Sequence, residues 1–452
     1  MGPRPIRQRQ FVEHKKYAHQ NNVPNPKKTN PSNKKMTCPK LLLFLVVLLS
    51  ACGGKKTPKT DTGPARVETI QTIHFFLETS ASMGGYLKGN TAFKDVVTDV
   101  VTKTNQIRPV SLYTISAKPQ PFAGDVGAFV AQLATTPLAT GKSSELHQIF
   151  GQVGQRAKNN DIAILVSDCI LSFPDADIRR DPEVNRNNAS STLKASINNQ
   201  FAAFSKQGIG ATVLAYTSPF NGTYYTYQNQ KKPLVGETRP FYIWIIGKQT
   251  LIAPFTQQLL ERLSTPPAKQ LDFGMAGALN RYDLFFGLNK SGKWRATQNN
   301  LADIELGRRA KSVEFAIGLN LSALPAYAQA ETYLKTNLRV GVNNGAATLV
   351  KVQKREAIPG TRLSPSEQKL LSQNTHVLTF RVDNLFANAA MTLSLPVRYD
   401  AWYTIWSTLD DRTTEGRQGK TFAFEPLMTG VREAYQTGQN SFVETTIQLQ
   451  KD

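Results

Sequence analysis

The sequence is poor in the residues that most metal and disulfide sites need, with 3 cysteines and 5 histidines among 452 residues. Hydrolases with two catalytic metal ions need several histidines and carboxylates, so the scarcity of histidine argues against that class. Long hydrophobic runs are also missing, apart from the nine residues 41–49. Together with a mean hydropathy of −0.32, this excludes a protein that crosses a membrane several times.

The remaining composition is that of a globular protein. Hydrophobic residues make up 40% and charged residues 19%, with 30 glycines and 25 prolines, which excludes collagen-like, coiled-coil and wholly disordered chains. The length is sufficient for two or three domains. A net charge of +21 is typical of nucleic-acid binding, but residues 1–51 contribute +9 of it and leave +12 for residues 52–452. We therefore expect no nucleic acid among the partners.

Residues 36–51 have the pattern of a signal peptide. A short charged region that begins at Met36 is followed by the apolar run, which is too short for the roughly 20 residues that a membrane-spanning helix needs. A buried core helix is the alternative, but no amphipathic period interrupts the run. Residues 1–35 have no apolar period, so we expect a disordered upstream extension, with Met36 as the translation start.

The segment Leu49-Ser50-Ala51-Cys52 resembles the lipobox of bacterial lipoproteins, in which the cysteine is acylated and becomes the mature N-terminus. The resemblance implies that Cys52 binds membrane lipid through its acyl chains, which hold firmly when there are several. Residues 52–67 are small, polar and basic, as in a flexible lipidated tether. The protein would then belong to the cell envelope. Gly53, in place of an acidic residue, favours the outer membrane, with the body facing the periplasm or the cell surface.

Residues 68–265 alternate apolar strands with helices. Strands that are apolar throughout their length predict a sheet covered on both faces, so we expect an α/β domain with a doubly wound, mostly parallel sheet. Residues 266–452 instead alternate apolar and polar positions between turns, which predicts a β-rich, sandwich-like domain with one late helix at 422–435. The expected strands of the two domains are 70–77, 110–115, 161–166, 209–216 and 240–246, then 314–321, 347–354, 376–382, 390–399, 402–409 and 442–449.

Polar residues follow two of the strands in the first domain. Glu78, Ser80 and Ser82 come after the first strand, and Asp168 comes after strand 161–166. Ligands of parallel sheets bind at the carboxyl ends of the strands, and alternate residues of a tight turn aim three oxygens at one point. Magnesium prefers oxygen ligands in octahedral array, so the pattern indicates a divalent-cation site. Helix capping and turn formation are the alternative roles of these residues.

The segment Glu78-Thr79-Ser80-Ala81-Ser82 resembles the D-x-S-x-S motif of von Willebrand factor A domains, which forms a metal-ion-dependent adhesion site. The resemblance covers roughly residues 68–265, under half of the chain, and implies a Rossmann-like fold, a Mg²⁺ or other divalent cation, and a partner carboxylate as the last ligand. It also implies that Ser143 or Ser144 replaces a threonine ligand and that Asp168 is the second aspartate.

One residue departs from the family pattern, because Glu78 stands where the family has aspartate. The extra methylene moves the carboxylate by about 1.5 Å, a shift that matters to a magnesium shell. Either Glu78 binds the cation directly, where aspartate would act through water, or the site holds no cation.

Three functions are compatible with these observations. The first is a membrane-anchored lipoprotein that binds an unidentified protein partner, or acts as a scaffold, through a cation-assisted site. The second is a metal-assisted phosphoester hydrolase of the cell envelope, in which the hydroxyl of Thr79 or Ser80 attacks while Asp168 holds a cation. The third is a polyanion binder, whose affinity would fall steeply with salt.

A tyrosine-rich segment, Thr223–Tyr227, precedes the strand at 240–246 and predicts a hairpin with exposed tyrosines. These rings would either anchor a partner or pack on the second domain.

Mass spectrometry of the protein purified from its native membrane tests the processing. We expect no peptide from residues 1–35 and an acylated N-terminal peptide that begins at Cys52. A Cys52→Ser variant should move from the detergent phase to the aqueous phase on phase separation. Peptides that precede Met36 would contradict the assigned start. A Cys52→Ser protein that stays in the detergent phase would contradict the lipid anchor.

Overall fold

A computed structural model describes residues 68–452, except 136–137, 140, 142–145, 172–174, 276–278, 308–310, 361–362 and 437–440. The predicted upstream extension, signal peptide, Cys52 and tether lie outside the described residues, as do Ser143 and Ser144. In the described part of the chain, no helix is both long and apolar enough to cross a membrane.

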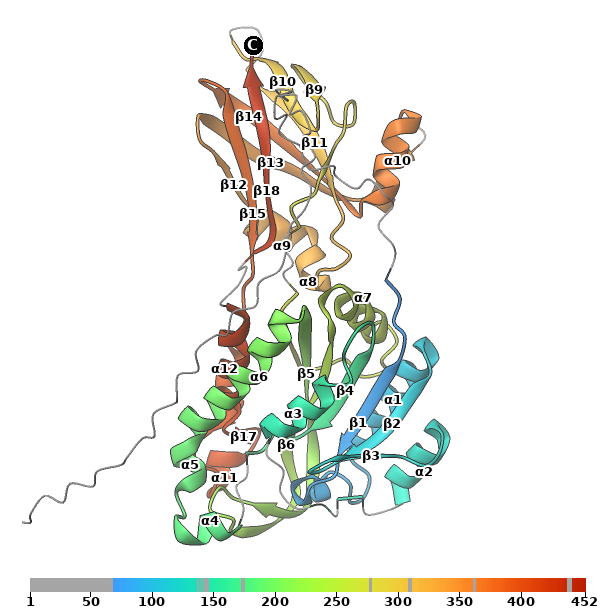
Figure 1. Ribbon diagram of the computed structural model, residues 1–452, viewed down its shortest axis with the longest axis vertical. Coiled ribbons are helices and arrows are strands. Elements are labelled where there is room, and N and C mark those ends of the chain that lie inside the picture. The colour runs from blue at the N-terminus through green and yellow to red at the C-terminus, as the bar shows by residue number, and fades with distance from the viewer. Residues whose placement is uncertain are drawn as a thin grey trace, which may run out of the picture. The chain divides into compact units, whose positions relative to one another are not determined.

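A seven-stranded sheet forms the centre of the first half of the described chain (Figure 1). The strand order is β3-β2-β1-β4-β6-β5-β7, with β1 parallel to β2 and to β4. β6 is antiparallel to both β4 and β5, so β5 runs in the direction of β4, and the edge strands β3 and β7 oppose their neighbours. The bounds are β1 Ile73–Glu78, β2 Val110–Ile115, β3 Pro119–Pro121, β4 Ile162–Ser167, β5 Ile209–Tyr225, β6 Lys231–Lys248 and β7 Lys269–Phe273.

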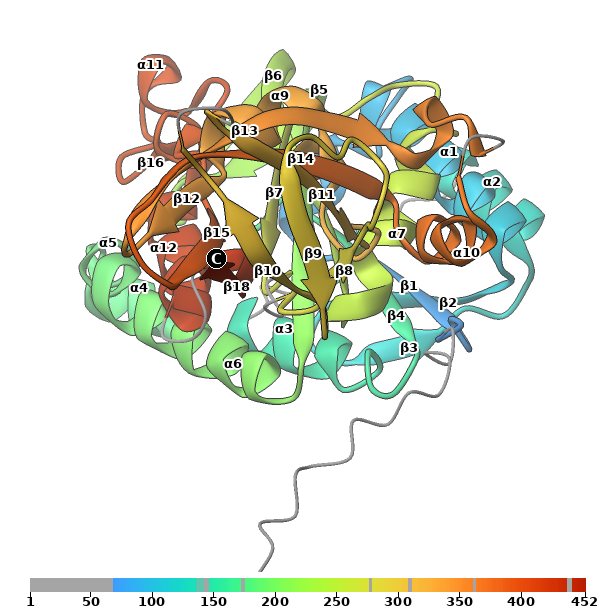
Figure 2. The same ribbon diagram turned by 90° about the horizontal axis from the view of Figure 1, so that it is seen from above.

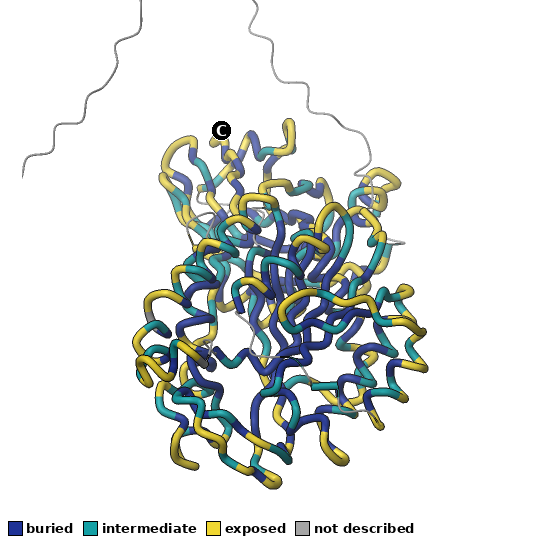
Figure 3. Tube along the Cα trace, turned by 60° about the horizontal axis from the view of Figure 1, so that its bottom comes forward, coloured by how far each residue is buried: buried dark blue, intermediate teal, exposed yellow. Residues whose placement is uncertain are grey.

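Alternating side chains of these strands build two separate apolar layers. Phe75 of β1 belongs to one buried cluster and Phe76 to the other, because successive strand residues point to opposite faces. Helices cover both faces, which confirms the α/β class: one face holds α1 Ala92–Ile107, α2 Val126–Thr135 and α7 Gln249–Leu260, and the other holds α3 Leu146–Gly154, α6 Lys194–Lys206 and α12 Phe424–Gln436. Figure 3 shows the buried strands surrounded by exposed loops and helix surfaces.

The second half of the sheet differs from a regular parallel arrangement. Strands expected at 209–216 and 240–246 are parts of one long antiparallel hairpin, joined by a turn around residues 226–230. Such a short connection is compatible only with antiparallel strands. Residues 217–240 of this hairpin pair only with each other, and we call them the arm.

Two further sheets, antiparallel except that β10 pairs with β18 in parallel, form most of the rest of the described chain (Figures 1 and 2). Their strand orders are β12-β15-β18-β10-β9 and β13-β14-β11-β8, and residues of both sheets belong to one continuous buried cluster, as expected of a sandwich. The strands are β8 Asp283–Leu284, β9 Lys293–Thr297, β10 Asn300–Glu305, β11 Val313–Leu319, β12 Arg339–Val342, β13 Gly345–Lys354, β14 His376–Leu385, β15 Ala389–Pro396 and β18 Ser441–Lys451. The accompanying helices are α8 Ala326–Gln329, α9 Glu331–Asn337 and α10 Pro365–Gln373.

The prediction of a strand at 402–409 is wrong. A 3-10 turn at Trp402–Thr404 is followed by the two-residue strand β16 Ser407–Thr408, which pairs with β17 Thr421–Phe422. Trp402 and Tyr403 belong to the apolar cluster of the seven-stranded sheet rather than to the sandwich. We call residues 407–422, which include α11 Thr414–Arg417, the brace.

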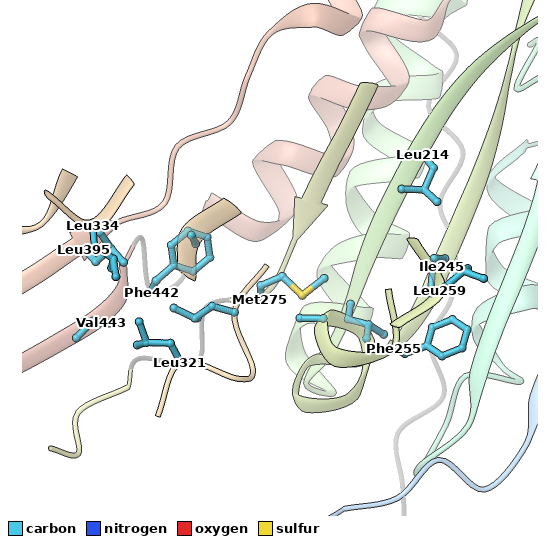
Figure 4. Packing of buried hydrophobic residues seen from close by; sticks show 14 of the residues in the cluster. Leu214, Ile245, Phe255, Leu259, Met275, Leu321, Leu334, Leu395, Phe442 and Val443 are labelled. Carbon is cyan, nitrogen blue, oxygen red and sulfur yellow. The ribbon is translucent and has the colours of Figure 1, made fainter. Parts of the chain in front are cut away.

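The seven-stranded sheet and its helices extend past residue 265, the predicted domain boundary. β7 pairs with β5, and α12 packs with α6. The chain therefore passes from this layer to the sandwich after β7, returns through Tyr399 and the brace to α12, and leaves again for β18. Figure 4 shows buried residues near the first of these crossings, with Met275 drawn between Leu321 and Phe255.

Asp272 of β7 is buried, at 3% exposure, and accepts hydrogen bonds from Thr212 (2.6 Å) and Gln270 (2.9 Å). Burial raises the pKa of Asp272 to about 6, although these two bonds lower it. Because the folded pKa lies above that of the unfolded chain, the protonated form stabilises the fold at low pH, and this contribution disappears as pH rises through 6.

Unfolding in denaturant at pH 4.5 and pH 8 tests this behaviour of Asp272. We expect the wild-type free energy of unfolding, relative to that of Asp272→Asn, to fall by about 2 kcal/mol between the two values. The asparagine has no charge to bury, and other titrating groups cancel in the difference. A difference that does not change with pH would contradict the assignment.

Candidate functional site

The two strands that carry the predicted site residues are neighbours in the sheet. β1 pairs in parallel with β4, so Glu78 at the end of β1 and Asp168 just after β4 lie at the same edge. Both side chains are buried, at 3% and 1% exposure. Ser80 is buried as well, whereas Ser82 is partly exposed.

Both carboxylate oxygens of Glu78 accept hydrogen bonds from serine hydroxyls. Ser80 Oγ donates to Glu78 Oε1 at 2.6 Å, and the hydroxyl of Ser167 donates to Glu78 Oε2. The hydroxyl oxygens of Ser80 and Ser82 lie 3.0 Å apart. Four oxygen-bearing side chains of one edge are thus joined in a single hydrogen-bonded chain.

The carboxylate of Asp168 accepts fewer hydrogen bonds than that of Glu78. Its Oδ1 accepts from the Ile170 backbone N–H at 3.1 Å, but Oδ2 is buried and has no hydrogen-bond partner among the described residues. The next residue, Cys169, has a left-handed backbone with φ of +55°, an uncommon conformation for a side chain of its size. It directs the chain away from β4 while its N–H donates to Ser167 Oγ at 2.8 Å. A buried carboxylate oxygen without a partner is the position where a cation or a donor would be stabilised.

The two carboxyl groups influence each other. Burial raises the pKa of Glu78, and the nearby Asp168 raises it further, while Ser167 and Ser80 lower it. Burial also raises the pKa of Asp168, and the Ile170 N–H, the Ser82 hydroxyl and the Arg239 guanidinium lower it. A divalent cation at this edge would lower both pKa values, because its charge favours the ionised forms.

The loop that leads to the predicted hydroxyl ligands lies beside the motif. Gly141 forms an isolated parallel bridge with Ser80, and its N–H donates to the Thr79 carbonyl at 2.9 Å. A Cβ at residue 141 would lie only 2.5 Å from Cβ of Ser116, so the approach requires glycine. Ser143 and Ser144 follow two and three residues later, outside the described residues.

Two residues of the site were not predicted. Ser167 is the last residue of β4 and bonds directly to Glu78. Arg239, in the arm, is only 1% exposed and lies close enough to Asp168 to lower its pKa. The sequence signal for Arg239 is a charged residue directly before the apolar run 240–246, although nothing local links it to the other site residues.

The arrangement gathers several side-chain oxygens at one edge of the sheet. Of the two hydroxyls considered for attack, that of Thr79 is buried and directed to the Ile115 carbonyl at 3.4 Å, whereas that of Ser80 donates to Glu78 Oε1 at 2.6 Å. Among the described residues, no group of three or more histidine, cysteine, aspartate or glutamate side chains is placed to hold a metal. The oxygens that converge here come from two carboxylates and three serines, Ser80, Ser82 and Ser167.

Comparison of the chain with protein-family models, with curated proteins and with solved structures gave no match in any of the three.

Proposed function

We propose that the protein is a lipid-anchored component of the bacterial cell envelope. It would bind a protein partner through a divalent cation at the edge of a domain similar to von Willebrand factor A domains, here called the A-type domain. The observation that carries the proposal is the proximity of Ser80, Ser82 and Asp168, together with the buried Oδ2 of Asp168, which no described residue contacts by a hydrogen bond. The anchor rests on the lipobox at residues 49–52 alone. The outer membrane, with the body facing the periplasm or the cell surface, remains the proposed location.

The ligands divide into direct and supporting groups. Ser80 and Ser82 have hydroxyl oxygens 3.0 Å apart, and Asp168 adds a carboxylate oxygen, so these three contact the cation. Glu78 accepts a hydrogen bond from the Ser80 hydroxyl, which leaves a lone pair of that hydroxyl oxygen for the cation. Ser143 or Ser144, water and a partner carboxylate would complete the octahedral shell that Mg²⁺ prefers.

The order of elements also supports an A-type domain. The resemblance implies a strand, the motif, a helix, a strand, a hydroxyl loop, a helix, a strand and then aspartate. The chain has β1, residues 78–82, α1, β2, then the additional elements β3 and α2, then Gly141, α3, β4 and Asp168 in that order. The antiparallel β5–β6 hairpin departs from a sheet of alternating parallel strands and helices.

Titration calorimetry with Mn²⁺ or Mg²⁺ on the full chain in detergent, after EDTA treatment, tests the cation site. We expect one binding event that Ser80→Ala/Ser82→Ala weakens at least tenfold, because two ligands are lost. The matched control is Ser394→Ala/Ser441→Ala, which removes two hydroxyls 3.2 Å apart in the sandwich. Equal binding by the two double variants would refute the assigned ligands.

Crosslinking in native membranes, followed by affinity capture, tests the partner. The yield of the crosslinked partner should fall several-fold in EDTA or in Asp168→Asn, because the bridging cation is lost. Asp303→Asn, an exposed aspartate paired with Arg295, should leave the yield unchanged. A partner captured equally well in all conditions would show that recognition does not use the cation.

A further inference from the structure

The arm contains a buried cation beside the candidate site. Arg239 donates from Nη1 to the Arg417 carbonyl (2.8 Å) and from Nη2 to the Lys420 carbonyl (2.9 Å), both in the brace. Its guanidinium carbon lies 4.2 Å from the centre of the Tyr224 ring, and its Nε is buried with no partner. Carbonyls and a ring face bind a guanidinium without neutralising it.

The positive charge of Arg239 acts on three neighbouring carboxylates, those of Glu237, Asp411 and Asp168. Among the described residues, Arg239 and Arg417 are the basic side chains that are buried. Arg417 is committed to Glu237, which it contacts through Nε at 3.0 Å and Nη2 at 2.9 Å. Arg239 lies 3.7 Å from the same carboxylate, a longer contact, and its charge also favours the ionised form of Asp168.

The brace fixes the arm through a second buried group. Asp411, which is fully buried, accepts from the Tyr224 hydroxyl at 2.5 Å and from the Tyr227 N–H at 2.9 Å. The Tyr227 ring stacks on Phe422, and Gly419 N–H donates to the Thr238 carbonyl at 3.0 Å. The hairpin tyrosines Tyr224 and Tyr227 are therefore buried and not exposed, and of the two predicted roles the structure confirms packing on the second half of the chain.

The arm also lies directly on the site's own turn, the 3-10 helix η1 Ala81–Gly85. A Cβ at Gly85 would lie 2.2 Å from the Phe220 ring, and one at Gly222 would lie 2.9 Å from the Gly85 Cα. Tyr86 donates to the Pro240 carbonyl at 2.5 Å at the base of the arm. This close contact is possible only because Gly85 of η1 and Gly222 of the arm have no side chains.

We propose that the arm is a lid over the cation site, held closed by Arg239 and the brace, and that cation binding and lid closure oppose each other. This inference rests on the proposed function. A divalent cation beside Asp168 adds positive charge next to the arm and repels the Arg239 guanidinium, which weakens the packing of the arm on the brace. By linkage, any change that opens the arm strengthens cation binding by the same factor. Opening of the arm then gives a partner carboxylate access to the cation.

The test combines hydrogen exchange with Mn²⁺ titration of the full chain. Mn²⁺ should speed exchange at the Tyr227 and Gly419 amides, whose acceptors lie across the arm–brace contact. It should not do so in Asp168→Asn. Gly222→Ala, which wedges the arm from η1, and Arg239→Gln should each tighten Mn²⁺ binding about tenfold. The control Arg339→Gln removes the same charge from an exposed position and should have no effect.

The outcomes separate the lid from the site. Wild-type binding of Mn²⁺ with unchanged exchange at both amides, and unchanged affinity in Gly222→Ala and Arg239→Gln, would overturn the lid and leave the cation site intact. Binding that occurs only in the two opening variants would support a lid that blocks the site. If none of these folded proteins binds Mn²⁺, the proposed cation site is itself wrong, and the inference falls with it. The hydrogen-exchange measurement uses the wild-type protein, so its result does not depend on whether the variants fold.

Discussion

The burial of two carboxyl groups, those of Glu78 and Asp168, at one edge of the sheet is the constraint on which the surrounding structure depends. Moving an ionised carboxylate out of water costs several kcal/mol unless hydrogen bonds or opposite charge replace its hydration. Ser80 and Ser167 supply hydroxyls to Glu78, and the Ile170 N–H serves one oxygen of Asp168. The charge of Arg239, which comes from the arm and not from the parallel strands, also lowers the pKa of Asp168.

The pattern of apolar residues along the chain was sufficient to predict several of the strands and helices. β4 is apolar up to its last residue, β1 and β2 are rich in β-branched and aromatic residues, and α1 has apolar residues on one face, so their patterns identify them. The length of β5 and β6 was not predictable in the same way. Pro219 and the register shift between Phe220 and Gly222 interrupt the strand pattern, and an apolar run does not indicate whether its neighbour is parallel or antiparallel.

The alternating segment 402–409 shows the opposite error. Its pattern is that of a strand, but Trp402 and Tyr403 are buried on the face of the seven-stranded sheet, where large rings fill the space beside α12. The site divides similarly. Spacing along the chain singled out Glu78, Ser80, Ser82 and Asp168, whereas Arg239 joins them only through the folding of a distant hairpin, which no local pattern encodes.

The path of the chain has a mechanical consequence. Three separate connections join the seven-stranded sheet to the sandwich, after β7, before the brace and after α12. The two parts are therefore tied covalently at three places, whereas two domains in tandem are joined by a single linker. Tension applied to the far sheets would be divided among three covalent paths, one of which ends at the brace.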